Sequence, residues 1–296
     1  MSEAVETPKA GWRMKVAIFA LAVSVFTVLW FAIAALGTKW GFWPWQVGLG
    51  QMTIGIGPGI AMLALGLSLI SQVISLIKAP RTQPFILSLG ATLIAAFCMF
   101  RLAGLGAQAN ALPPLHDIQT DWENPIQYSE AVMSARDAQG DTNPVLDAPV
   151  VPDYAETRWP GTAGRLVSEL QEEAETKDAG KGTVYPKMET VYFDQPPAEV
   201  AAIAERIMDR RGWEIVFTGT TGGSMGEELQ IDATATSGWF GFKDDIAVRL
   251  RPVEGATAVD IRSTSRVGLS DLGANSTRVY NLMIELEDRA DGRREP

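Results

Sequence analysis

The chain has 296 residues, of which 47% are hydrophobic and 20% are charged, and its formal net charge at pH 7 is −10. Its one histidine and one cysteine are too few to form a Cys/His zinc site or an intrachain disulfide. Residues 1–111 carry a net charge of +5 and residues 112–296 carry −15, so the second part lacks the basic surface that binding to nucleic acid requires.

Three long uncharged stretches occupy the first 111 residues, and they contain 23, 38 and 19 residues. A helix that crosses a hydrocarbon core about 30 Å thick needs about 20 apolar residues, so each stretch is long enough to span a membrane. The middle stretch opens with the aromatic run WGFWPWQ, which is typical of a membrane interface, so its helix is expected to begin near Ile54. The predicted spans cover about residues 16–37, 54–77 and 82–101.

Basic residues beside the spans predict their orientation. Lys9, Arg13 and Lys15 precede the first span, and Lys78 and Arg81 lie between the second and the third. The positive-inside rule assigns these five to the cytoplasmic side, so the N-terminus is cytoplasmic and the acidic part is periplasmic, on a bacterial inner membrane. A cleaved signal peptide is the alternative interpretation of the first span, and it leaves the acidic part on the same side.

The interior of each span contains no ionisable residue, whereas ion and proton pathways usually contain one. We therefore expect an anchor in the lipid bilayer, or a docking surface for a membrane protein complex, rather than a channel.

Residues 112–296 are expected to form one soluble periplasmic domain. Its first part, residues 112–187, is rich in Pro, Gly, Asp and Ala and has few periodic apolar positions, so we predict a loop-rich insert with one helix over 163–177. This composition is compatible with a flexible insert and with a lid over a binding site.

Residues 188–290 show clearer patterns and are expected to form the core of the domain. Alternating and helical spacings of apolar residues predict the order β-α-β-β-β-β-α. This order indicates an α+β fold, in which an antiparallel sheet carries two helices on one face. The predicted strands are 190–193, 213–218, 228–236, 245–252 and 257–266, and the predicted helices open at Pro196-Pro197 and at 271.

The last two strands are joined around Glu254-Gly255, and a two-residue turn fixes their register. Arg249 then lies opposite Asp260, and Asp245 lies diagonally across from Arg262. We expect a ladder of alternating charge on the solvent-exposed face of this hairpin, with the apolar residues on the opposite, buried face.

The chain resembles a bacterial family known as domain of unknown function 1499. The resemblance rests on DDIAVRLRP at 244–252 and DIRSTSRVGLSDLGANSTRV at 260–279, and it extends to LPPLHDIQTDWENP at 112–125, Tyr185-Pro186, Gly212-Trp213 and WFGF at 239–242. It covers 112–290, and the acidic insert around 169–181 is long for the family. The resemblance implies an envelope protein with N-terminal spans and assigns no catalytic residue, because the family has no established activity.

His116, Asp117 and Asp121 are the candidate catalytic residues, because a histidine near carboxylates can act as a general base or bind a metal. They would suit a periplasmic hydrolase or a metal-dependent enzyme. Since no nucleophile lies nearby, we favour the alternative that His116 packs where the domain begins. No metal site or cofactor is expected. Asp244, Asp245 and Asp271 could bind a cation through their oxygens, but the positive charges of the arginines close to them in the chain would oppose it.

Four arginines on one face of the hairpin form a second candidate site, for an anion such as a lipid phosphate or a carboxylate. They are Arg249, Arg251, Arg262 and Arg266. The alternative is a ladder of ion pairs that is either solvated or covered by the insert.

The sequence therefore favours a non-catalytic binding or scaffold module, anchored in the inner membrane, for a partner membrane protein or an envelope component. The hydrolase and the binding of a lipid or another anionic ligand at the arginines are the alternatives.

Overall fold

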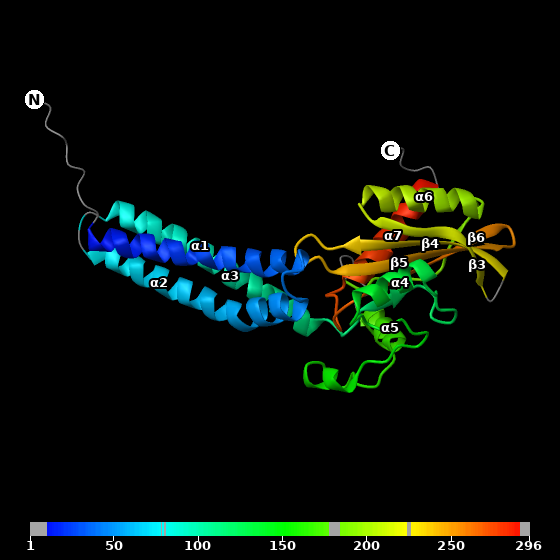
Figure 1. Cartoon of the computed structure of the whole chain (residues 1–296), viewed down its shortest axis with the longest axis horizontal. Coiled ribbons are helices and arrows are strands. Elements are labelled where there is room, and N and C mark those ends of the chain that lie inside the picture. Colours follow the sequence, from blue (N-terminus) through cyan, green and yellow to red (C-terminus); the bar gives the residue numbers. More distant parts are fainter. Residues whose placement is uncertain (1–10, 78, 80, 178–183, 224–225, 291–296) are drawn as a thin grey trace, which may run out of the picture. The chain divides into compact units, whose positions relative to one another are not determined.

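The computed structural model describes residues 11–77, 79, 81–177, 184–223 and 226–290 (Figure 1). Two of the basic residues that predict the orientation, Lys9 and Lys78, lie outside the described residues, as does part of the acidic insert. The chain divides into two compact units, of which the first contains the apolar helices and the second contains the sheet.

Three apolar helical segments, each long enough to cross a membrane, make up most of the first unit, as the sequence predicts. They are α1 (Trp12–Lys39), the continuous pair η1 (Gln46–Ile56) and α2 (Gly57–Ile77), and α3 (Thr82–Ala111). The third helix continues ten residues past its expected end at 101, because the segment after Arg101 is rich in alanine and no proline occurs before Pro113.

The second helix begins at Gln46 rather than near Ile54, and its first part is a π-helix. Wider π-turns shift the hydrogen bonds, so that the Gly57 N–H donates to the Met52 carbonyl. The same carbonyl accepts a hydrogen bond from the Trp30 indole at 2.9 Å. Glycine is required at Gly48, where a Cβ atom would lie 1.9 Å from the hydroxyl of Thr38. Close contact with α1 therefore accompanies the early start of this helix.

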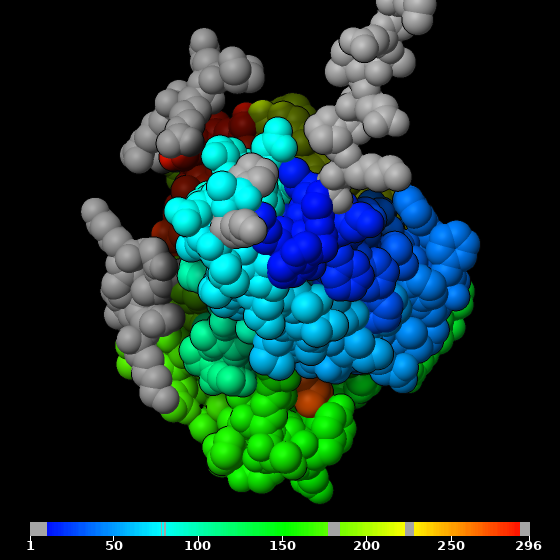
Figure 2. All heavy atoms as spheres, turned by 90° about the vertical axis from the view of Figure 1, so that its left-hand side faces the viewer, coloured from blue at the N-terminus to red at the C-terminus, as the bar shows by residue number. Residues whose placement is uncertain are grey.

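Small side chains line the contacts between the three helices, which pack closely when viewed from the end of the bundle (Figure 2). Buried positions on α2 and α3 recur every three or four residues, and most of the large apolar side chains point outward. Hydroxyl groups join the helices where Ser71 and Ser88 lie 2.6 Å apart. Small residues and hydroxyl pairs are typical of helix packing in lipid. The buried positions on these two helices are Gly57, Ala61, Ala64, Ser68, Ser71, Ser75, Pro84, Ser88, Ala91, Ala95 and Cys98.

The second unit is built on a six-stranded antiparallel sheet, which confirms the predicted α+β fold. The strand order is β1-β6-β5-β4-β3, and β2 also pairs with β6. The strands are β1 (Asp117–Gln119), β2 (Val191–Phe193), β3 (Glu214–Gly223), β4 (Gly226–Thr236), β5 (Lys243–Val253) and β6 (Ala256–Ser265).

Helices α6 (Pro197–Arg210) and α7 (Ala274–Ala290) pack together against one face of this sheet (Figure 1). Their buried apolar stripes, which include Ile207 and Leu282, meet Ile231, Val248 and Ile261 of the strands in the main core. Burial of this apolar face is the main force that holds the domain together.

The insert is more regular than the sequence predicts. It contains α5 (Val167–Lys177) as expected, and also α4 (Glu130–Gln139), which the sequence analysis missed. Helix α4 buries only Val132 and Arg136, so it lacks the repeating apolar stripe that predicts a helix. Strand β1 was missed as well, because all three of its residues are buried and show no alternation.

Candidate functional site

The face of the sheet opposite α6 and α7 carries charged side chains, and it is buried. Asp117, Asp232, Asp245, Asp260 and Arg262 are each fully shielded from solvent. The prediction of a solvent-exposed face is wrong, because the segment 120–146 lies over it. Three side chains of this segment, Ile126, Tyr128 and Val132, pack around Ala247 in the middle of the face.

Asp117 and Arg262 form a fully buried ion pair on this face. Arg262 donates from Nε and Nη2 to the two carboxylate oxygens at 3.0 and 2.5 Å, and Thr264 donates to Asp117 at 2.7 Å. The remaining donors of Arg262 reach the carbonyls of Ile126 and Leu146 at 2.7 and 2.8 Å. Arg262 therefore joins β6 to β1 and to two points of the covering segment.

Asp245 forms a second buried centre, with partners that differ from those predicted. Its carboxylate accepts hydrogen bonds from Arg266 at 2.7 and 2.9 Å, from Arg136 at 2.6 Å and from Thr234 at 2.7 Å. The register confirms that Asp245 lies diagonally across from Arg262, but Arg262 forms its ion pair with Asp117 on β1. Arg136 was missed by the sequence analysis, since a lone arginine in a polar helix gives no signal of burial.

Asp260 joins the two remaining arginines of the hairpin. Arg249 and Arg251 both donate to it, at 3.0 and 2.7 Å, and the predicted register of Arg249 opposite Asp260 is confirmed. Burial alone would raise the pKa of Asp260, but hydrogen bonds from Thr190 and Arg251 and the nearby charge of Arg249 hold it below its ordinary value.

Asp232 lies on the same face, and no lysine or arginine of the described residues forms an ion pair with it. Its carboxylate accepts hydrogen bonds from the Ser129 N–H at 2.6 Å and from Gln230 at 2.8 Å. Burial raises the pKa of Asp232, because the charged form loses its hydration.

His116, Asp117 and Asp121 do not converge on one reaction centre. His116 is 8% exposed, and Nδ1 of its ring has no hydrogen-bond partner in the part of the chain that the structure describes. Burial lowers its pKa, so the imidazole is neutral at pH 7. Asp121 instead accepts two backbone N–H groups, from Glu123 and Asn124, at 3.0 Å each.

The four arginines of the proposed anion site likewise pair with carboxylates along the buried face rather than lining one shared surface. Arg262 contacts Asp117, and Arg266 contacts Asp245. Arg249 and Arg251 share Asp260 and also lie 3.2 and 3.7 Å from Asp121. Within the described ranges, no group of three or more His, Cys, Asp or Glu side chains is placed to hold a metal ion.

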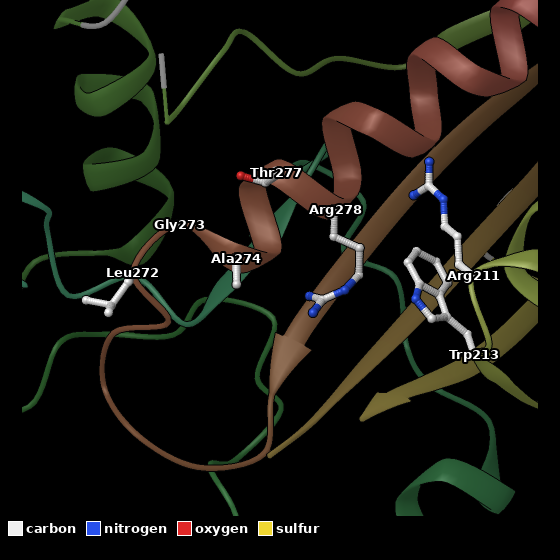
Figure 3. Close-up of a pocket in the computed structure, with 7 residues that line it drawn as sticks. All are labelled: Arg211, Trp213, Leu272, Gly273, Ala274, Thr277 and Arg278. Carbon is white, nitrogen blue, oxygen red and sulfur yellow. The ribbon is translucent and has the colours of Figure 1, made fainter. Parts of the chain in front are cut away.

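A hollow on the helical side of the domain was not predicted (Figure 3). It has a volume of about 350 Å³. Arg211 from the turn between α6 and β3 and Arg278 from α7 both approach the indole of Trp213, with guanidinium carbons 5.3 and 5.9 Å from the ring centre. The remaining lining residues are Leu272, Gly273, Ala274 and Thr277. From the sequence, Trp213 was predictable only as the start of a strand and as part of the Gly-Trp motif.

Each arginine of the hollow also has a carboxylate partner. Arg278 donates to Asp244 at 2.6 Å and to Ser263 at 3.0 Å. Arg211 donates from Nη2 to Glu285 at 2.7 Å and to the Asn281 carbonyl at 3.1 Å.

The model of one protein family matches residues 117–286, and its description is protein of unknown function (DUF1499). No match was found among curated proteins or among solved structures.

Proposed function

The chain belongs to the DUF1499 family of proteins of unknown function, and we propose that it is a non-catalytic binding module anchored in the bacterial inner membrane. In this proposal the three apolar helices hold the module in the bilayer and the acidic α+β domain faces the periplasm. The excess of basic residues before the first span and between the second and third supports that orientation.

One observation carries the non-catalytic part of the proposal: each candidate acid–base group is either hydrogen-bonded within the protein or buried. Both oxygens of Asp117 accept hydrogen bonds from Arg262, and Asp121 caps a turn. A general base needs to reach the proton that it removes, whereas the ring of His116 is buried. The hydrolase alternative would require the hydrogen bonds of Asp117 and Asp121 to break and His116 to become exposed.

The same reasoning weighs against an anion site at Arg249, Arg251, Arg262 and Arg266. An anion would have to displace Asp117, Asp245 or Asp260, each of which is fully buried beside its arginine. Removing one member of such a pair leaves a buried charge without compensation, at a cost of about 3–5 kcal/mol. Ion pairing within the domain is the simpler role for these arginines.

The experiment that tests the proposal is native mass spectrometry of the full chain, released from its own membranes in a mild detergent. We expect a complex in which a protein partner or an envelope component is bound at fixed stoichiometry. The His116→Gln variant should carry the same component in the same amount, because the imidazole takes no part in binding. A clean monomer without any bound component would contradict the binding function.

A further inference from the structure

A groove runs along the exposed side of α7 and consists of two adjoining hollows that share Arg211. The first is the hollow beside Trp213, and the second, of about 460 Å³, continues toward the end of the helix. The second is lined by Arg211, Asn281, Ile284, Glu285, Asp288 and Arg289. We call the two together the α7 groove, and it lies entirely within the sheet-containing unit.

The first hollow has more hydrogen-bond donors than acceptors. Among the described residues, Nε and Nη1 of Arg211, Nε of Arg278, the indole N–H of Trp213 and the hydroxyl of Thr277 have no hydrogen-bond partner. On the buried face of the sheet, the guanidinium groups of Arg262 and Arg266 meet carboxylates and carbonyls at nearly every donor, although Nε of Arg249 has no hydrogen-bond partner within the described ranges. Unused donors in a hollow favour a ligand that only accepts hydrogen bonds.

Arginines concentrate around the α7 groove although the domain as a whole is acidic. Glu285 forms ion pairs with three of them, Arg210 at 3.2 Å, Arg211 at 2.7 Å and Arg289 at 2.7 Å. The arginines that line the groove, Arg211, Arg278 and Arg289, are matched by Glu285, Asp288 and Asp244. The groove is therefore close to neutral, so an anion meets less repulsion there than over the rest of the acidic domain.

Apolar groups line the same groove beside these donors. The indole of Trp213 is partly exposed, and Leu272 and Ile284 contribute aliphatic surface. In Figure 3 the indole lies beside both arginine side chains, that of Arg278 from α7 and that of Arg211 from the turn before β3. Leu272 adopts a left-handed backbone with φ of 57°, a strained conformation that is often found at ligand sites. The start of α7 does not add to the site, because Asp271 already accepts its N–H groups.

We propose that the α7 groove binds a phosphate ester, with Arg211 as the principal ligand of the phosphate and Trp213 as the wall against which the organic part packs. The proposal rests on the binding function proposed above and names its ligand class. Nε and Nη1 of Arg211 have no hydrogen-bond partner among the described residues, so they can donate to phosphate oxygens, and a guanidinium group suits phosphate recognition.

Calorimetric titration of the full chain in phosphatidylcholine nanodiscs tests this site. The probes are glycerol phosphate, a soluble ester, and dihexanoyl phosphatidic acid, which has the same headgroup chemistry on a lipid. We expect saturable binding of at least one probe and an affinity at least tenfold lower in Arg211→Gln. Phosphatidic acid binding tenfold more tightly than glycerol phosphate would identify a lipid headgroup as the source, and equal affinities would identify a soluble ester.

Arg158→Gln is the matched control, because Arg158 also lies over an indole, that of Trp159, at 5.0 Å, outside the groove. Its affinity should equal that of the unmodified chain. Trp213→Phe keeps a ring but removes the indole N–H, and it should bind two- to tenfold more weakly. Equal binding by Arg211→Gln and the unmodified chain, or no binding of either probe at millimolar concentrations, would overturn the site.

The two proposals fail in different ways. If native mass spectrometry finds a bound component that Arg211→Gln retains, the binding function stands and the α7 groove is not its site. If the unmodified chain carries nothing, the binding function itself fails.

Discussion

Arg262→Met removes the central cation of the buried face and keeps a side chain of similar length. The change leaves Asp117 buried with its charge uncompensated, and it removes the donors to the carbonyls of Ile126 and Leu146. Breaking a fully buried ion pair from one side costs about 3–5 kcal/mol. Domains of this size have total stabilities of roughly 5–15 kcal/mol, so the change would consume a large part of that stability.

Hydrogen–deuterium exchange of the full chain in nanodiscs measures this effect locally. The stability lost in Arg262→Met should speed amide exchange in peptides from the covering segment 120–146 by roughly 100- to 3000-fold, since each 1.4 kcal/mol corresponds to a factor of ten. Asp117→Asn combined with Arg262→Met should recover part of the loss, because the double change leaves no unpaired charge.

Arg165→Met is the control for a surface ion pair. Arg165 contacts Glu173 at 2.9 Å, but the two side chains are 37% and 39% exposed. Solvent screens such a pair, so its loss should cost less than about 1 kcal/mol. If Arg262→Met changes exchange as little as Arg165→Met does, the charged face does not stabilise the domain and the structural reasoning is refuted.

Three further predictions concern stability. Asp232→Asn should lower the free energy of unfolding in urea by less than about 1 kcal/mol, because that carboxyl has no cationic partner among the described residues and its pKa is raised. Asp245→Asn should lower it by about 3–5 kcal/mol, because Arg136 and Arg266 both donate to Asp245. Equal losses in the two variants would count against this division of roles. Burial raises the pKa of Asp271 from 3.8 to about 6, so its contribution to stability is present below pH 3.8 and is lost as the pH rises through about 6. Asp271→Asn should remove this pH dependence of the free energy of unfolding, which amounts to roughly 3 kcal/mol. Unfolding curves of both proteins at several pH values between 3.8 and about 6 measure the difference. Ala91→Phe places a large ring where the helix contact is fully buried, so thermal unfolding in nanodiscs should show a loss of about 1–3 kcal/mol, and an unchanged midpoint would mean that this contact is loose.

The hairpin of β5 and β6 was predictable because its register depends on a two-residue turn and on a period of two. Both signals are local, and the pairing of Arg249 with Asp260 followed from them. The three apolar helices were predictable for the same reason, since length and composition alone indicate a span.

The burial of the charged face was not predictable, because it depends on contacts between distant parts of the chain. Asp117 and Arg262 are 145 positions apart, and Arg136 reaches Asp245 across 109. Short strand β1 and polar helix α4, which carry Asp117 and Arg136, lack the apolar periodicity that would have marked them as part of the fold.

The α7 groove was hidden for a related reason. Trp213 and Arg278 come from segments 65 positions apart, and only the packing of α6 against α7 brings them together. The Gly-Trp motif was visible in the sequence, but nothing near it indicated which arginines would approach the indole.

In our proposal, the arginines of the sheet face add to the stability that the apolar core provides, and Arg211 of the α7 groove binds the ligand. Measuring unfolding and phosphate-ester affinity on Arg262→Met and Arg211→Gln tests this claim most directly. We predict that Arg262→Met loses stability but, where folded, keeps the affinity, while Arg211→Gln keeps stability within about 1 kcal/mol and loses at least tenfold in affinity. The reverse pattern, with affinity lost in folded Arg262→Met and kept in Arg211→Gln, would contradict the account and assign binding to the sheet face.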